Sequence, residues 1–195
     1  MEKTMEIEWI EDYIKAQHLA LESIDRIRVK EVIDVLSQAN ATGKKIFVCG
    51  NGGNAANASH FTTDLGKNAS AAMPKPFRVM SINDNVSWMT AIGNDFSYDD
   101  VFVCQLMNHA DTGDLLITSS VSGSSPNVVK ALEWAREKGM TTIVLVGGRR
   151  GKCVELADYL LVVEETHYGR VEDVQMHILH MLCYAFVEKT ISQQS

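Results

Sequence analysis

The sequence lacks glycine at both ends and concentrates it in the middle. No glycine occurs in residues 1–42 or after Gly169, and all 13 glycines of the 195-residue chain lie between Gly43 and Gly169. The three prolines fall within the same window. Because glycine and proline mark turns, this distribution excludes a solenoid of uniform repeats and predicts two helical ends around an α/β core.

The chain also lacks an excess of positive charge. Its formal net charge is −7, and its lysines and arginines are scattered. The one tight basic cluster, Arg149, Arg150 and Lys152, is typical of a solvated turn. A protein whose main task is to grip nucleic acid usually carries a basic face, so we expect no nucleic-acid partner.

The cysteines and the hydropathy pattern give no sign of a secreted or membrane protein. The four cysteines, at positions 49, 104, 153 and 183, are too far apart for a CxxC zinc motif or a dense disulfide framework. The acidic, amphipathic N-terminus is unlike a signal peptide, and no apolar run approaches the roughly 18 residues that span a bilayer. We expect a cytoplasmic protein with no membrane partner.

Helical periodicity without a breaker runs through residues 5–38. Ile7, Ile10 and Ile14 fall on one face, and a bend near Ser23–Asp25 separates two predicted helices. The apolar stripe needs a cover, and a partner subunit is one obvious cover. We therefore expect residues 1–42 to be a helical arm for oligomerisation.

The middle of the chain repeats a unit of apolar run, turn and helix. The runs are short and apolar on both faces, as buried parallel strands are: 45–49, 77–82, 115–119, 142–146 and 159–163. The helices predicted around them are 54–66, 86–93, 99–110, 125–139, 152–157 and 169–190. The alternation predicts an α/β fold with a doubly wound, five-stranded parallel sheet. We expect one domain over 1–195, with its core at 43–168 and a C-terminal helix at 169–192.

Ligands of such sheets bind beyond the carboxyl ends of the strands, so the turns there matter most. The turn SVSGSSP at 120–126 offers serine hydroxyls, a glycine that lets backbone approach a ligand, and a helix start that attracts phosphate. A serine-rich helix cap is the plain alternative, but one cap needs one serine. No lysine follows the glycines, so neither this turn nor GNGGN at 50–54 is a P-loop.

The turn after the first strand also matches a weak dinucleotide fingerprint, Gly50-x-Gly52-x-x-Ala55. That fingerprint requires an acidic residue about 20 positions further on, at the end of the second strand. The acid found there, Asp84, comes too late in the sequence. The spacing therefore argues against a nicotinamide-dependent oxidoreductase.

Acids and histidines recur at helical spacing in two places. His60 and Asp64 share one face of the helix after the first strand. The last helix carries two of each kind: Glu172, Asp173, His177 and His180. Together these could form a metal site, or they could be a surface ion pair and a helix-end histidine. Spacing alone favours the second interpretation, because nothing in it proves that the two helices meet.

Three motifs in order resemble the sugar isomerase (SIS) domain: CGNGGNAANASHF at 49–61, GNDF at 93–96 and SVSGSS at 120–125. The resemblance covers nearly the whole chain. It is strongest to the phosphoheptose isomerase branch, which interconverts sedoheptulose 7-phosphate and a heptose 7-phosphate. It implies the SIS fold, a homotetramer with shared active sites, one zinc ion per subunit, and a product that feeds lipopolysaccharide, capsule or another glycoconjugate.

The resemblance also implies the site residues. It assigns the phosphate to the serine turn, through Ser120, Val121, Ser122 and Ser125. It assigns contacts with the sugar to Asn51, Gly52, Gly53, Asp64, Asn94, Asp95 and Glu172. The matching metal positions are His60, Asp64, Glu172 and His180. The reaction passes through an enediol, with Asp64 expected as the base, His180 as the acid and the metal polarising the carbonyl.

Three positions depart from the usual pattern of these isomerases. Asp64 stands where a glutamate is usual, Glu172 where a glutamine is usual, and Val121 where a threonine is usual. A different sugar phosphate, or a branch with altered activity, would explain them. The alternative function is a non-catalytic SIS-domain scaffold or regulator of the replication-initiator-associating type. Such a protein lacks the acid and histidine that this chain keeps at Asp64 and His180, which favours the enzyme.

Overall fold

A single parallel sheet forms the centre of the protein. The computed structural model describes residues 2–194, and the side chains of residues 6–188. All five strands are parallel, in the order β2-β1-β3-β4-β5. They are β1 (Lys45–Gly50), β2 (Arg78–Ser81), β3 (Leu115–Ser120), β4 (Thr141–Gly147) and β5 (Tyr159–Val163). This confirms the predicted doubly wound sheet, and its switch point lies between β1 and β3, where ligands of this architecture bind.

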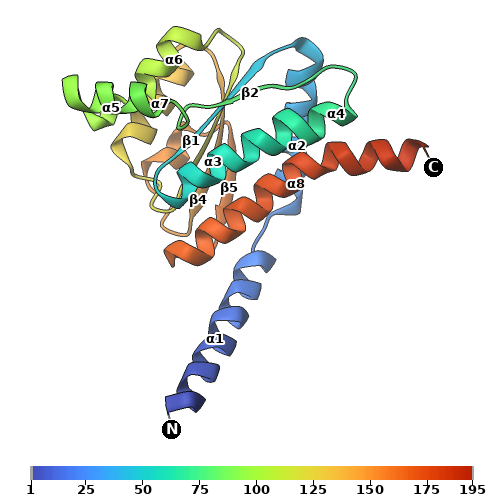
Figure 1. Ribbon diagram of the computed structural model, residues 1–195, viewed down its shortest axis with the longest axis vertical. Helices are drawn as coiled ribbons and strands as arrows, with labels where there is room; N and C mark the ends of the chain where they lie inside the picture. Colours follow the sequence, from blue (N-terminus) through green and yellow to red (C-terminus); the bar gives the residue numbers. More distant parts are fainter. Residues whose placement is uncertain (1, 195) are drawn as a thin grey trace.

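Helices cover both faces of the sheet (Figure 1). On one face lie α2 (Arg26–Thr42), α3 (Gly53–Thr63) and α8 (Tyr168–Gln194). On the other lie α5 (Val86–Asp95), α6 (Val103–His109) and α7 (Pro126–Glu137). Successive residues of a strand point to opposite faces, so Ile46 and Val48 belong to the first core and Phe47 to the second. β1, β3 and β4 are buried on both faces, which explains why they read as continuous apolar runs, whereas the edge strand β2 is partly exposed.

The helix after β1 differs from the prediction of 54–66, which is wrong at its end. α3 passes into a π-helical segment, η1 (Asp64–Ala69), and then into α4 (Ser70–Ala72). The wider turn arises where the backbone N–H and the hydroxyl of Ser70 both bond to the Leu65 carbonyl oxygen. π-helical turns are frequent at functional sites, and this one begins at Asp64.

Two other predicted helices are also corrected. The segment expected at 99–110 begins as a 3₁₀ turn, η2 (Tyr98–Asp100), and becomes α-helical only in α6. The segment expected at 152–157 is a 3₁₀ helix, η3 (Lys152–Leu156). There the backbone N–H of Cys153 bonds to the carbonyl oxygen of Gly123 at 2.8 Å, so a contact with the serine turn sets the start of η3.

The N-terminal arm consists of two helices with the predicted bend. α1 (Glu2–Glu22) ends just before Asp25, whose side chain accepts hydrogen bonds from the backbone of Ile27 and Arg28 and caps α2. α1 projects away from the sheet (Figure 1). Several of its large apolar side chains are exposed, and Trp9 is 65% exposed, whereas Ala20 near its end lies in the core. Among the described residues, no helix is long and apolar enough to cross a membrane.

Candidate active site

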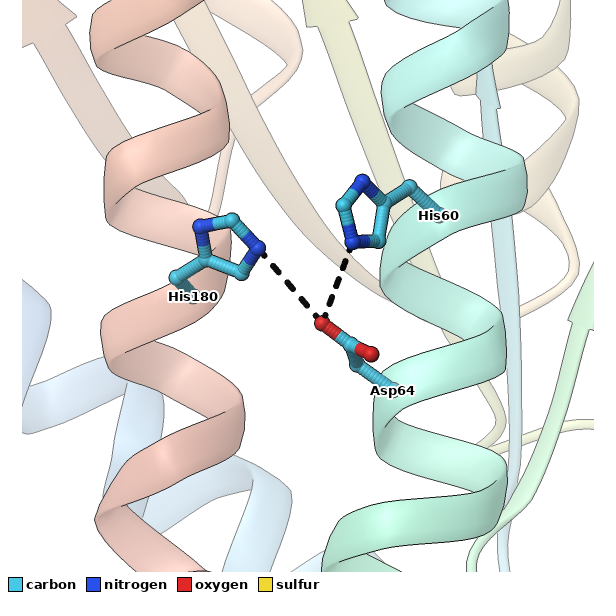
Figure 2. Close-up of side chains that lie close together, drawn as sticks. All are labelled: His60, Asp64 and His180. Carbon is cyan, nitrogen blue, oxygen red and sulfur yellow. Dashed lines mark ion pairs between the residues drawn. The ribbon is translucent and has the colours of Figure 1, made fainter.

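The last helix meets the helix that follows β1. α8 packs beside α3 and η1, which brings His180 next to His60 and Asp64 (Figure 2). Oδ2 of Asp64 lies 3.4 Å from Nε2 of His60 and 3.5 Å from Nε2 of His180. The centroids of the two imidazole rings lie 5.0 Å apart, and the planes of the rings are nearly perpendicular. Spacing along the sequence left open whether these helices meet, and their packing answers that question.

The carboxylate of Asp64 is the buried member of this cluster. Its side chain is 12% exposed, against 55% for His60 and 40% for His180. Nδ2 of Asn68, one turn further along η1, donates to Oδ1 of Asp64 at 3.1 Å. This hydrogen bond holds one carboxylate oxygen and leaves the other directed at both histidines. Burial and the charge of Asp64 raise the pKa of the nearby Cys183 thiol to about 11, and this thiol is not part of the three-residue cluster.

The three side chains fit a zinc ion. One ligand atom from each of His60, Asp64 and His180 lies within 4.8 Å of the others. Ligand atoms about 2.0–2.1 Å from a tetrahedral ion lie about 3.4 Å from one another. The separations of 3.4 and 3.5 Å match this geometry. Three protein ligands with a free position for another molecule are typical of catalytic zinc sites.

Glu172 lies on α8 towards the start of α3, and its carboxylate is not part of this three-residue cluster. A Cβ atom added to Gly53 would come within 2.3 Å of Oε2 of Glu172, so a side chain at position 53 would displace this carboxylate. Nδ2 of Asn57 donates to the backbone oxygen of Glu172 at 3.0 Å. Burial, with a smaller effect of the Asp173 charge, raises the pKa of the Glu172 carboxyl group.

The serine turn leads from β3 into α7. Oγ of Ser120 accepts a hydrogen bond from the backbone of Gly123, and Oγ of Ser122 accepts one from Ser124. Ser125 stands at the cap position of α7, where its side chain makes no capping bond within the described chain. Val121 is 4% exposed and packs into the core, so it can offer a ligand only its backbone.

The turn that follows β4, residues 148–151, packs against the serine turn. Gly123 has φ +64°, and an added Cβ atom would lie 1.9 Å from the carbonyl oxygen of Arg150. A Cβ atom on Gly151 would lie 2.4 Å from the backbone of Gly123. The two turns therefore touch backbone to backbone, and a side chain at either glycine would separate them. The arginine-containing turn that the sequence marks as solvated thus has a structural role.

A cavity of about 440 Å³ opens beside the turn after β1. Its lining comes from that turn, from the end of β2 and from α5 and η2: Gly50, Asn51, Gly52, Ala55, Asn83, Val86, Met89, Thr90, Gly93 and Tyr98. The hydroxyl of Tyr98 lies 3.3 Å from Oδ1 of Asn51. The cavity therefore lies at the carboxyl end of β1, next to the switch point of the sheet.

The SIS domain family matches residues 11–147, which is most of the chain. The chain belongs to the SIS domain family. Among its relatives is the phosphoheptose isomerase of Rhodospirillum rubrum, 37% identical over 156 residues that cover 80% of this chain and 82% of that protein. The probable phosphoheptose isomerase of Thermoplasma volcanium is 37% identical over 175 residues, covering 89% and 88%.

Solved structures agree with this assignment. The phosphoheptose isomerase of Neisseria gonorrhoeae is 28% identical, with a TM-score of 0.84, over 95% of this chain and 98% of that one. The phosphoheptose isomerase of Francisella tularensis shares the fold, with a TM-score of 0.85 at 24% identity, over 94% and 98%. These relatives place the SIS-domain chain in the phosphoheptose isomerase branch and identify it as an aldose–ketose isomerase.

The structure does not bring every expected SIS site residue to one place. Asn94 and Asp95 lie exposed at the end of α5, where Nδ2 of Asn94 donates to Oδ1 of Asp95. Gly93 lines the cavity, whereas neither of these two does in the described chain. Conversely, Asn68 and Tyr98 contact the expected residues Asp64 and Asn51, but no local motif in the sequence marks them.

Proposed function

We propose that this SIS-domain protein interconverts sedoheptulose 7-phosphate and D-glycero-D-manno-heptose 7-phosphate through an enediol. The observation that carries the proposal is the contact between Asp64 and His180, an acid and a base on two neighbouring helices of a fold that also has a serine-rich turn at a helix start. Proton transfer next to a carbonyl group needs such a pair.

The phosphate would bind at the serine turn. The hydroxyl groups of Ser120, Ser122 and Ser125, the backbone of Val121 and the free N–H groups at the start of α7 are its proposed ligands. The backbone of Asn51, Gly52 and Gly53 would contact the sugar. His60 lies seven residues into α3, so the histidine cluster is about 10 Å along the helix from its start. The reacting end of the sugar would thus lie well away from its phosphate.

The proton transfers follow from the two roles. In the ketose-to-aldose direction, Asp64 removes a proton from carbon 1 and His180 donates a proton to the oxygen on carbon 2, which gives the enediol. The enediol then takes a proton at carbon 2 and loses the proton of the oxygen on carbon 1. The carbonyl group has moved from carbon 2 to carbon 1, and no atom or electron has been gained or lost.

A zinc ion, one per subunit, would be held by His60, Asp64 and His180 through the atoms that face one another, and would polarise the carbonyl group of the substrate. The proton transfers would then use the atoms that the ion leaves free, the second carboxylate oxygen of Asp64 and the Nδ1–H of His180. Glu172 would add negative charge near this site and contact the substrate, although its carboxylate points to the start of α3. The exposed apolar side chains of α1 support the proposal that four copies assemble through their arms and share active sites. Uncovered, such a surface would favour aggregation.

The non-catalytic alternative has less support. A transcription-factor SIS domain from Sphaerobacter thermophilus shares the fold with a TM-score of 0.65, but at 19% identity the likeness extends only to the fold. The relatives at 35–38% identity carry the name of an enzyme. The retained Asp64 and His180 point the same way.

The test is turnover of sedoheptulose 7-phosphate by the purified protein, with added zinc and after chelation. Asp64→Asn and His180→Ala should each lower kcat at least about 100-fold, the usual effect of losing a general acid or base. His177→Ala is the matched control, because His177 is an exposed histidine of the same helix outside the cluster. No turnover of any heptose, hexose or pentose phosphate by the zinc-loaded protein would refute the proposal.

Metal content tests the zinc assignment separately. The purified wild type should contain close to one zinc ion per chain. His60→Ala should lose it and His177→Ala should keep it. Equal zinc content in both variants would place the ion elsewhere.

A further inference from the structure

Asn127 forms a reciprocal amide pair with Asn51, 76 residues away in the sequence. Nδ2 of Asn51 donates to Oδ1 of Asn127 at 2.8 Å, and Nδ2 of Asn127 donates to Oδ1 of Asn51 at 2.9 Å. Asn51 belongs to the turn after β1, and Asn127 to the first turn of α7. The pair therefore connects the proposed sugar-binding turn with the proposed phosphate-binding turn.

The orientation of this pair is fixed by the backbone. The N–H of Val128 donates to Oδ1 of Asn127 at 3.0 Å, so the oxygen of that amide cannot exchange places with its nitrogen. The nitrogen must then face Asn51. The hydroxyl of Tyr98 also points to Oδ1 of Asn51, at 3.3 Å. Both lone pairs of that oxygen are therefore used inside the protein.

Burial makes the pair costly to break. Asn127 is 2% exposed, and a buried polar group without a partner is strongly unfavourable. β1 and β3 are neighbours in the sheet, so the two turns start side by side, and the sheet holds them only at their strand ends. Beyond those ends, the amide pair is a direct side-chain connection between them.

We propose that Asn127 is a positioning residue that acts through Asn51 to set the distance between the phosphate-binding and sugar-binding turns. The inference rests on the proposed function for its choice of substrate. Asn127 itself need not touch the ligand. Its loss would let the turn after β1 move relative to the start of α7, so the same sugar phosphate would no longer contact both turns at once.

A double-mutant cycle tests this proposal. Asn51→Ala, Asn127→Ala and the double variant are compared by the KM and kcat for sedoheptulose 7-phosphate, by the Kd for inorganic phosphate and for a heptitol 7-phosphate, and by Tm. Each single substitution should raise KM about tenfold, and the double variant should be no worse than either, because both remove the same interaction. kcat should change less than twofold.

Asn40→Ala is the control for simple loss of stability. Asn40 is also a buried asparagine, 7% exposed, and its amide bonds to the carbonyl oxygen of Lys75, away from both turns. This variant should lower Tm and leave KM unchanged. If Asn127→Ala behaves in the same way, the pair is merely structural and the proposal is wrong. Additive losses, or a loss from Asn51→Ala alone, would also overturn it, because Asn51 would then act directly on the ligand.

Binding measurements separate this proposal from the proposed function. The binding of a heptitol 7-phosphate, which is the substrate without its carbonyl group, needs no turnover, and Asn51→Ala and Asn127→Ala should weaken it by the same factor. Inorganic phosphate contacts the serine turn alone, so its affinity should stay at the wild-type value in both variants. If no sugar phosphate is turned over but both variants weaken heptitol 7-phosphate binding equally, the isomerase assignment fails and the role of the pair holds. If turnover is present and neither variant changes KM or heptitol 7-phosphate affinity, the role of the pair fails alone.

Discussion

Replacing Gly123 with alanine should show that the serine turn keeps its position only while it packs against the turn at residues 148–151. The new methyl group would lie 1.9 Å from the carbonyl oxygen of Arg150 and 2.6 Å from its carbonyl carbon. Both atoms are backbone, so neither can rotate away as a flexible side chain would. The two turns must separate, and the serine hydroxyls move with them.

The expected loss of stability in Gly123→Ala is the sum of two contributions. A left-handed backbone costs a non-glycine residue about 1–2 kcal/mol, and Gly123 has φ +64°. Overpacking adds about 1–3 kcal/mol. Gly43→Ala isolates the first contribution, since Gly43 has φ +70° and the described residues place no atom within 4 Å of an added Cβ.

Thermal unfolding of both variants measures the difference. In a chain of this size, 1 kcal/mol shifts Tm by about 2–4 °C, so Gly123→Ala should unfold about 2–12 °C below Gly43→Ala. Its affinity for inorganic phosphate should also fall, while that of Gly43→Ala stays at the wild-type value. Equal Tm and equal phosphate affinity in the two variants would refute the reasoning.

Three further predictions concern other parts of the molecule. The pKa of Glu165 is lowered from 4.5 to about 2, mainly by a hydrogen bond from Arg170. The ionised carboxylate therefore stabilises the folded state fully above pH 4.5, and this stabilisation is lost as the pH falls towards 2. The free energy of unfolding of the wild type should exceed that of Glu165→Gln by less and less as the pH falls across that range, and a difference that stays constant would contradict this. Asn68→Ala should weaken zinc binding about tenfold in competition with a chelator, because Asp64 loses its hydrogen bond; unchanged affinity would refute that role. The full chain should be a tetramer in light scattering if the proposed assembly is right, and deleting residues 1–22 should reduce it to a smaller species; an unchanged size would exclude the arm as the interface.

The strands were the predictable part of the fold. Buried parallel strands are apolar on both faces, so five short runs were visible in the sequence, and the sheet contains all five strands. The π-helical turn at Asp64 was not predictable. It depends on bonds from Ser70 to the Leu65 carbonyl oxygen, which leave no trace in the periodicity of the apolar residues.

The candidate site likewise contains residues that the sequence could predict and residues that it could not. Local spacing identified His60 and Asp64 as neighbours, but only the packing of α8 on α3 brings His180 to them. Asn127 had no signal at all, because its partner lies on a distant turn and asparagine near a helix start is ordinary. The residue pattern could not predict contacts between segments that lie far apart in the sequence.

Deuterium incorporation tests the central claim most directly. The reaction is run in D₂O with zinc-loaded wild type and sedoheptulose 7-phosphate, and the aldose product is analysed by NMR at carbon 2. Proton transfer through an enediol, with Asp64 as the base, predicts solvent deuterium at carbon 2 to the extent that the removed proton exchanges before it is returned. It also predicts that Asp64→Asn forms product at least about 100-fold more slowly. Asp64→Asn turning over like the wild type would contradict the account.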